Sequence, residues 1–243
     1  MAAKLNVLLL DVSKDALDII YAACRQCYSA EFAGDSFKRS ADEAEKREKF
    51  VRQVVASGHE SPLEHVKFTF AIEGVSRALT HQLVRHRIAS YSQQSQRYVK
   101  EAAFEYVVPP SIESDAEMMK EYLGIMQKIQ DSYNTLSRFF EKKGKRGESA
   151  NQDARFVLPQ ATETKIVVTM NCRELGHFFK ERCCARAQWE IRRLAEEMLK
   201  ICKKELPAVF ENGGAKCVEL GYCPEGPKFT CKRFPLKEEA RKN

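Results

Sequence analysis

The stretch VKFTFAIEGVSRALTHQLVRHR, residues 66–87, decides the expected fold because a strand pattern runs directly into a helix pattern. Apolar residues alternate with Lys, Thr and Ala over Val66–Ile72, and this period of two predicts a strand with one buried face. Over Val75–Arg87 the apolar residues recur at helical spacing, which predicts a helix. The basic triplet Arg85–Arg87 is then expected near the C-terminal end of that helix.

Upstream of this stretch, the sequence predicts a strand and two helices. The segment Leu5–Leu10 is typical of a buried strand, and Ser13 is a candidate cap for the helix after it. The inward stripe of that helix runs from Leu17 to Cys27. A second helix is expected over Ala41–Ser57, with Gly58 in the left-handed conformation beyond its end.

Two short motifs predict where helices begin. In SPLE, residues 61–64, Ser61 is expected to cap a helical turn, with Glu64 as its reciprocal partner in a capping box. Asn171 is expected to cap a later helix, with Glu174 three residues on.

Downstream of the triplet, we expect a polar loop and then further strands and helices. Strand material is predicted at Tyr98–Val99 and in FEYVVPP, residues 104–110, and a second strand at Lys165–Met170. Long amphipathic helices are predicted over Met118–Phe140 and around Ala187–Cys202.

The mixed order of strands and helices predicts an α/β (α+β) fold with a mixed sheet packed against long helices. We expect one domain over residues 1–210 and a tail rich in Cys, Gly and Lys over residues 211–243.

Composition limits the class of protein. The chain has 243 residues and a formal net charge of +6, which favours anionic ligands. The longest wholly aliphatic run, Val7–Leu10, is far shorter than the ~20 residues that span a bilayer. Nine cysteines, an odd number, are more consistent with reduced thiols than with a disulfide framework. We therefore expect a cytoplasmic protein that binds no membrane.

The cysteines of the tail are the remaining candidates for a metal site. Cys217, Cys223 and Cys231 are unevenly spaced and lack CxxC pairs. We therefore predict no metal, while a zinc or cluster site with a fourth ligand stays an alternative.

The polar stretch RHRIASYSQQSQRY, residues 85–98, carries the chemistry that the sequence makes most visible. The chain has neither a GxGxxG motif after its first strand nor a Walker loop, so a nucleotide must be held by side chains. Arg85, His86, Arg87 and Arg97 can bind phosphates by charge-assisted hydrogen bonds. Compensation of a helix dipole is an alternative explanation of the triplet, and a nucleic-acid surface of basic and stacking groups is another.

A second concentration of polar residues is MNCRELGHFFKERCCARAQWEI, residues 170–191. Asn171 and Arg173 stand at a predicted helix N-terminus, which suits an anion or a polar cofactor. Arg182 and Arg186 follow at a spacing that is equally typical of an exposed helix face.

These segments resemble the flavin-dependent thymidylate synthases. The signature of that family is similar to Arg85–Arg87 followed after seven residues by Ser95. Four further segments are similar to the family in the same order: GHESPLEH, ARFVLP, MNCREL and RCCARAQWEI. Because five matched segments occur in order from about His59 to Ile191, coincidence is improbable.

The resemblance implies the fold of that family and a homotetramer whose active sites are shared between subunits. It implies FAD as the cofactor, and conversion of dUMP to dTMP with methylenetetrahydrofolate as carbon donor, NADPH as reductant and tetrahydrofolate as the product. Nucleic acid is not an expected partner. A nucleic-acid-binding module and a flavoenzyme acting on another pyrimidine nucleotide are the alternatives.

The resemblance also implies roles for individual residues. The residues expected to bind FAD are Ser61, Arg85, His86, Arg87, Gln93, Asn171, Arg173 and His177. Those expected to bind dUMP are Gln82, Arg85, Gln93, Gln94, Ser95, Gln96, Arg97, Arg155 and Arg182. Arg182 is the expected catalytic residue, because a fixed guanidinium beside the uracil stabilises the negative charge that develops as the ring accepts hydride. Ser95 lacks a base at catalytic spacing and is expected to bind substrate rather than to act as a nucleophile.

Overall fold

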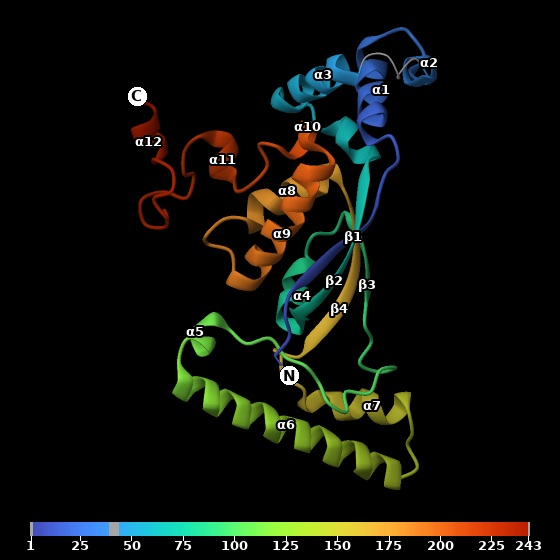
Figure 1. Cartoon of the computed structure of the whole chain (residues 1–243), viewed down its shortest axis with the longest axis vertical. Helices are drawn as coiled ribbons and strands as arrows, with labels where there is room; N and C mark the ends of the chain where they lie inside the picture. The colour runs from blue at the N-terminus through green and yellow to red at the C-terminus, as the bar shows by residue number, and fades with distance from the viewer. Residues whose placement is uncertain (1, 39–43, 243) are drawn as a thin grey trace. The chain divides into compact units, whose positions relative to one another are not determined.

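The computed structural model describes residues 2–38 and 44–242, which form helices around one sheet (Figure 1). The described residues fall into two compact units. The first unit comprises residues 2–6, 71–85 and 91–167, and the second comprises residues 7–38, 44–70, 86–90 and 168–242.

The sheet has four strands in the order β1-β2-β4-β3. Its strands are β1 (Asn6–Val12), β2 (Lys67–Ser76), β3 (Ala89–Gln93) and β4 (Glu163–Asn171). Thr69 pairs with Thr169 across β2 and β4, at 3.0 Å between hydroxyl oxygens, while Gly74 donates its N–H to Glu163. Residue numbers thus fall along β4 as they rise along β2. The sheet is antiparallel, so the prediction of a mixed sheet is wrong in this respect.

The strand predicted at residues 66–72 is confirmed by β2, where Phe68, Phe70 and Ile72 are buried. The first strand is confirmed in place, but its predicted burial is wrong. Leu8 is 59% exposed and Leu10 is 52% exposed, because both lie on a face of β1 that is open to solvent. A run of aliphatic residues does not reveal whether both faces of its strand are covered.

The helix of the basic triplet is shorter than predicted. Helix α4 spans Arg77–Leu83, and Ser76 caps it by accepting the N–H of Leu79 at 3.0 Å. The triplet Arg85–Arg87 therefore follows the helix rather than lying within it. The predicted polar loop contains β3, whereas Tyr98–Val99 forms no strand and Tyr106 makes only isolated bridges.

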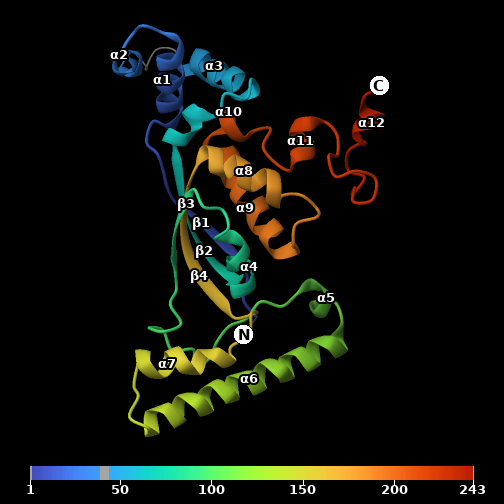
Figure 2. The same ribbon diagram turned by 180° about the vertical axis from the view of Figure 1, so that it is seen from behind.

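The other helices of the first unit lie between β3 and β4 in the chain. They are α5 (Pro110–Glu113), α6 (Ala116–Lys142), α7 (Glu148–Ala154) and the 3₁₀ turn η3 (Arg155–Val157). Both views show α7 beside α6 (Figures 1 and 2). The predicted long helix is confirmed by α6, and Asp115 caps it by accepting the N–H groups of Glu117 and Met118.

The N-terminal helices of the second unit group together in both views (Figure 2). They are α1 (Ala16–Tyr28), α2 (Ala33–Lys38) and α3 (Ala44–Ala56), followed by the 3₁₀ turn η2 (Ser61–His65). Ser13 does not cap α1, because its hydroxyl accepts the N–H of Lys67 at 3.0 Å. The predicted inward stripe also ends early, since Cys27 is exposed.

The predicted second helix is confirmed over the described part of its range, Ala44–Ala56, while residues 41–43 lie outside the described residues. Gly58 has the expected left-handed conformation, with φ of 79°. The helical turn at SPLE is confirmed by η2, but its predicted capping box is wrong. Glu60 occupies the N-cap position, and the Ser61 hydroxyl lies 3.0 Å from Nε2 of His59 instead.

The later helices of the second unit are α8 (Cys172–Arg182), α9 (Trp189–Glu205), α10 (Pro207–Phe210), α11 (Lys216–Leu220) and α12 (Lys237–Ala240). The predicted cap of α8 is confirmed, because Asn171 Oδ1 accepts the N–H of Glu174 at 2.8 Å. The predicted helix around Ala187–Cys202 is confirmed by α9. The domain boundary at residue 210 stays a prediction.

Aromatic packing fixes α8 within the second unit. Phe68, Phe178, Phe179 and Phe210 are buried, with ring centroids 5.8 Å apart for Phe68 and Phe210 and 5.9 Å apart for Phe179 and Phe210. Removing one such ring from a core costs about 3–5 kcal/mol. The helix that carries the candidate site residues therefore has a rigid support.

No helix in the described part of the chain is long and apolar enough to cross a membrane.

Gly74→Ala tests a close backbone approach in the first unit. Gly74 has φ of 70°, and a Cβ there would lie 1.9 Å from the carbonyl oxygen of Lys4. We expect a loss of about 3 kcal/mol or more in the free energy of unfolding, from conformational strain and overlap together. The control is Gly58→Ala, which has a similar φ but no atom within 4 Å of the added methyl group, and is expected to lose about 1 kcal/mol. Equal losses in urea unfolding would show that the contact with Lys4 is unimportant.

Candidate active site

His86 is the most connected side chain among the predicted site residues. It is 5% exposed and follows α4 in the chain. Its Nδ1 lies 3.2 Å from Oε1 of Glu174, and its Nε2 lies 3.1 Å from Nε of Arg182. An arginine Nε carries a hydrogen and can only donate, so Nε2 of His86 must accept. The ring proton then lies on Nδ1, which donates to the Glu174 carboxylate.

The surroundings of His86 keep its ring neutral. Burial, together with the charges of Arg182 and His177, lowers its pKa from 6.5 to about 4. The Phe178 ring stands edge-on to the imidazole, at 4.9 Å between ring centroids. Burial also raises the pKa of Glu174 above its ordinary value. At neutral pH, His86 therefore offers Arg182 an uncharged acceptor.

Helix α8 brings Glu174 and Arg182 to the same imidazole. The two residues are eight positions apart, slightly more than two helical turns, so they lie on one face. Glu174 was missed as a site residue because its sequence position already explained it as part of a helix start. Its spacing to Arg182 on one helix face was the available signal.

The remaining residues predicted to bind FAD in the second unit have different surroundings. Arg173 forms ion pairs with Glu60 and Glu64, so η2 and the start of α8 are joined by charge. Arg87 is exposed, and none of the carboxylates in residues 2–38 and 44–242 pairs with it. His177 is exposed, with its ring centroid 5.7 Å from that of His86.

The first unit holds the predicted glutamine segment. Nε2 of Gln93 donates to the hydroxyls of Thr80 and Thr164, each at 3.2 Å. Sequence reasoning missed both threonines, since neither has a recognisable spacing to Gln93. Oε1 of Gln94 and Nε2 of Gln96 are buried and have no hydrogen-bond partner among the described residues. Buried polar groups are nearly always paired, so these two amides differ from most buried polar groups of a folded protein.

Arg97 and Ser95 are held at the end of that segment. The Ser95 hydroxyl accepts the N–H of Arg97 at 3.2 Å, and the Arg97 guanidinium pairs with Glu148. Asn151 donates to the Arg97 carbonyl at 3.0 Å. Gln82 is half-buried and Arg85 is exposed, and Arg85 has no ion-pair partner within the described chain.

A pair of arginines in the first unit is a candidate anion site. Burial lowers the pKa of the Arg77 guanidinium, and the charge of Arg155 lowers it further. Two cations close enough to repel each other are stabilised by an anion placed beside both. Sequence reasoning found Arg155 but not Arg77, because Arg77 lies in the first turn of α4, far from Arg155 in the sequence.

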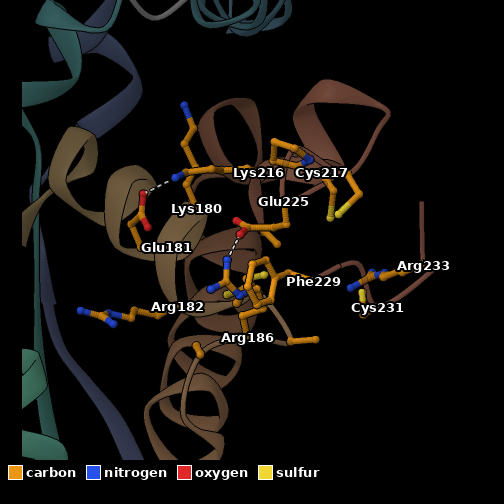
Figure 3. Close-up of a pocket in the computed structure, with 17 residues that line it drawn as sticks. Lys180, Glu181, Arg182, Arg186, Lys216, Cys217, Glu225, Phe229, Cys231 and Arg233 are labelled. Carbon is orange, nitrogen blue, oxygen red and sulfur yellow. Dashed lines mark hydrogen bonds and ion pairs between the residues drawn. The ribbon is translucent and has the colours of Figure 1, made fainter. Parts of the chain in front are cut away.

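A cavity of about 280 Å³ lies in the second unit, between the end of α8 and the segment around α11. Two ion pairs lie in its lining, Glu181 with Lys216 and Glu225 with Arg186 (Figure 3). Arg182 contributes to its wall, but Figure 3 shows the Arg182 side chain extending away from the other labelled side chains. The predicted chemistry of Arg182 is therefore not directed into this cavity.

Cysteines also line the cavity, among them Cys217, Cys223 and Cys231. They are free thiols, and burial raises the pKa of Cys217. Within the described ranges, no group of three or more His, Cys, Asp or Glu side chains is placed to hold a metal ion.

The neutral state of His86 should make the fold sensitive to acid. Its pKa in the folded chain, about 4, is below the ordinary 6.5, so between these pH values the unfolded chain binds a proton that the folded chain does not. The stability associated with neutral His86 is complete above pH 6.5 and falls as the pH approaches 4. We expect the wild type to lose up to about 3 kcal/mol more than His86→Gln between pH 7 and pH 4 in urea unfolding.

His81→Gln is the matched control for this comparison, because it replaces an exposed histidine that does not contribute to the pKa shift of His86. Its loss of stability should follow that of the wild type. Parallel pH profiles for the wild type and His86→Gln would contradict the assignment.

The sequence is similar to a family model and to known proteins over most of its length. Residues 8–208 match the model of a family described as thymidylate synthase complementing protein. The chain is 55% identical over 236 residues to a protein of Nitratidesulfovibrio vulgaris, and the match covers 96% of both chains. It is 46% identical to a protein of Clostridium tetani over 96% of both chains, and 44% identical to one of Pyrococcus furiosus over 90% of this chain and 89% of the relative.

All three relatives carry the name flavin-dependent thymidylate synthase. The family model and the relatives each cover most of the chain, including the basic triplet and α8. The chain therefore belongs to the flavin-dependent thymidylate synthase family.

Proposed function

We propose that the chain converts dUMP to dTMP, with FAD as cofactor, methylenetetrahydrofolate as carbon donor and NADPH as reductant. The observation that carries this proposal is the 55% identity, over 96% of both chains, to a protein named flavin-dependent thymidylate synthase. At that identity and coverage, a change of reaction would require a change in the site.

The chain offers suitable groups for FAD. Arg87 is exposed and lacks an ion-pair partner among the described residues, so it can bind a phosphate group without breaking an existing pair. Arg173 stands at the start of α8, an eleven-residue helix, where the N–H groups favour an anion. Its pairs with Glu60 and Glu64 would have to be exchanged for the cofactor. When bound and reduced, FAD supplies the hydride for the uracil ring.

The first unit offers matching groups for dUMP. Gln94 and Gln96 each have one buried amide atom without a partner among the described residues, so a nucleotide that reaches these atoms can add hydrogen bonds without displacing existing ones. Arg77 and Arg155 form a pair of repelling cations, which suits a phosphate. Arg77 is thus an additional candidate beside the residues that the family resemblance suggested.

Arg182 is proposed to activate the uracil ring. Its Nε is bound to His86, and no other described residue accepts a hydrogen bond from its terminal nitrogens. These nitrogens are therefore available to stabilise negative charge on the ring as it accepts hydride. Because the guanidinium is already oriented, little reorganisation is required at the moment of reaction.

We further propose that the active protein is a homotetramer with shared active sites. Met118, Ile125 and Phe139 are exposed on α6, and their spacing in multiples of seven places them on one side of the helix. An exposed apolar stripe on a long helix is typical of a surface that another subunit covers.

The reaction is tested by mass-spectrometric detection of dTMP after incubation of the purified protein with FAD, NADPH, dUMP and methylenetetrahydrofolate. Product should disappear when either folate or flavin is omitted. Arg182→Ala should lower kcat by at least about 100-fold while the flavin stays bound. The reason is that removing one preorganised hydrogen-bond donor from a developing charge typically lowers kcat by about that factor. Wild-type activity without folate would contradict the proposed reaction, and normal turnover of Arg182→Ala would contradict the role of Arg182.

The assembly is tested by light scattering coupled to size-exclusion chromatography. We expect the mass of four chains for the wild type and a smaller species for Ile125→Lys, which places a charge in the apolar stripe. Gln127→Lys adds a charge to the opposite side of the same helix and should keep the wild-type mass. A monomeric wild type would contradict the proposed assembly.

A further inference from the structure

We propose that Glu174 is a positioning residue for Arg182 and that it acts through His86. This inference rests on the proposed function, in which Arg182 activates the uracil ring. Glu174 fixes the tautomer of His86, and His86 in turn fixes the plane of the Arg182 guanidinium.

The first step concerns the direction of the two hydrogen bonds. A neutral imidazole has one donor and one acceptor nitrogen. If His86 carried its proton on Nε2, that N–H would face the Nε–H of Arg182, and two donors would oppose each other. A carboxylate at Nδ1 accepts only, so Glu174 stabilises the tautomer in which Nε2 is free to accept.

The second step concerns the orientation of the arginine. A guanidinium is planar, so a hydrogen bond at Nε restricts the direction in which both terminal nitrogens point. The acceptor that makes this bond is itself buried, being 5% exposed, and is held from its other side by Glu174. The Nε atom of Arg182 is therefore held by His86, while the two terminal nitrogens of the guanidinium stay available.

The third step concerns charge. A carboxylate bound directly to Arg182 would form an ion pair and offset the positive charge that the reaction uses. The neutral imidazole provides an acceptor without a negative charge at that place. Glu174 thus orients Arg182, while the imidazole of His86 lies between the Glu174 carboxylate and the guanidinium.

The fourth step concerns the cost of burying Glu174. Its side chain is almost fully buried, with the residue 7% exposed, and a buried carboxylate is unfavourable unless it has a specific partner. The cap of α8 uses the backbone N–H of Glu174 and not its carboxylate. An apolar side chain would fill the position at lower cost, so the contact with His86 is the reason for a carboxylate here.

A double-mutant cycle on the full-length flavin-loaded protein tests the inference. Glu174→Ala should lower kcat about tenfold and weaken dUMP binding several-fold, measured by equilibrium dialysis, with unchanged flavin content. In the Arg182→Ala background, the same change should alter kcat and the dUMP Kd by less than about twofold, because residues that act as one unit are not additive. Fully additive losses would overturn the proposal, since they would show that Glu174 acts without Arg182.

Glu181→Ala is the matched control for the cycle. Glu181 precedes Arg182 on the same helix but binds Lys216, so its removal should change kcat less than about twofold. A loss as large as that of Glu174→Ala would show that any carboxylate on α8 has the same effect, which would also overturn the proposal.

Two substitutions of His86 keep the test decisive if Glu174→Ala does not retain flavin. The amide oxygen of His86→Gln can still accept from Arg182, whereas His86→Leu offers no acceptor. We expect the Gln variant to exceed the Leu variant at least about fivefold in kcat; equal rates would contradict the inference. Absence of dTMP from the wild type would instead contradict the proposed function, and the two failures are thereby distinguishable.

Discussion

The hydrogen bond from Arg182 to His86 is the interaction on which the candidate site depends. An arginine Nε can only donate, so the buried imidazole beside it must present Nε2 as an acceptor and carry its proton on Nδ1. Glu174 accepts that proton's hydrogen bond, and burial keeps the ring neutral with a pKa of about 4. A carboxylate, a neutral ring and a cation therefore follow one another, and each determines the state of the next.

The packing of α8 is what allows this order to form. Phe178 and Phe179 are fully buried, and Asn171 fixes the first turn by accepting the N–H of Glu174. One residue of α8 corresponds to a rotation of about 100°, so a shift of register by one residue would remove both Glu174 and Arg182 from His86. The aromatic core of the second unit thus has a functional consequence as well as a stabilising one.

Local patterns predicted the parts of the fold that local physics determines. The alternation in β2 and the cap at Asn171 depend on neighbours in the sequence, and both were correct. Strand β3 was missed because its polar residues show no buried face, and its pairing with β4 is a long-range property. Glu174 was assigned only to the start of a helix, and its contact with His86, 88 positions away, is also a long-range property.

The two groups of site residues differ in how completely their hydrogen bonds are formed. The two hydrogen bonds that link Glu174, His86 and Arg182 are formed without a ligand. Gln94 and Gln96, in contrast, each have one buried amide atom without a partner among the described residues. An unpaired buried polar atom costs about 1–3 kcal/mol, and a nucleotide that pairs with it recovers that cost on binding. An arginine that is already oriented instead stabilises the negative charge that develops on the uracil ring during the reaction. No further loss of side-chain entropy opposes this stabilisation. The unpaired amides are therefore suited to affinity for the substrate, and the preformed arginine is suited to the rate of its conversion.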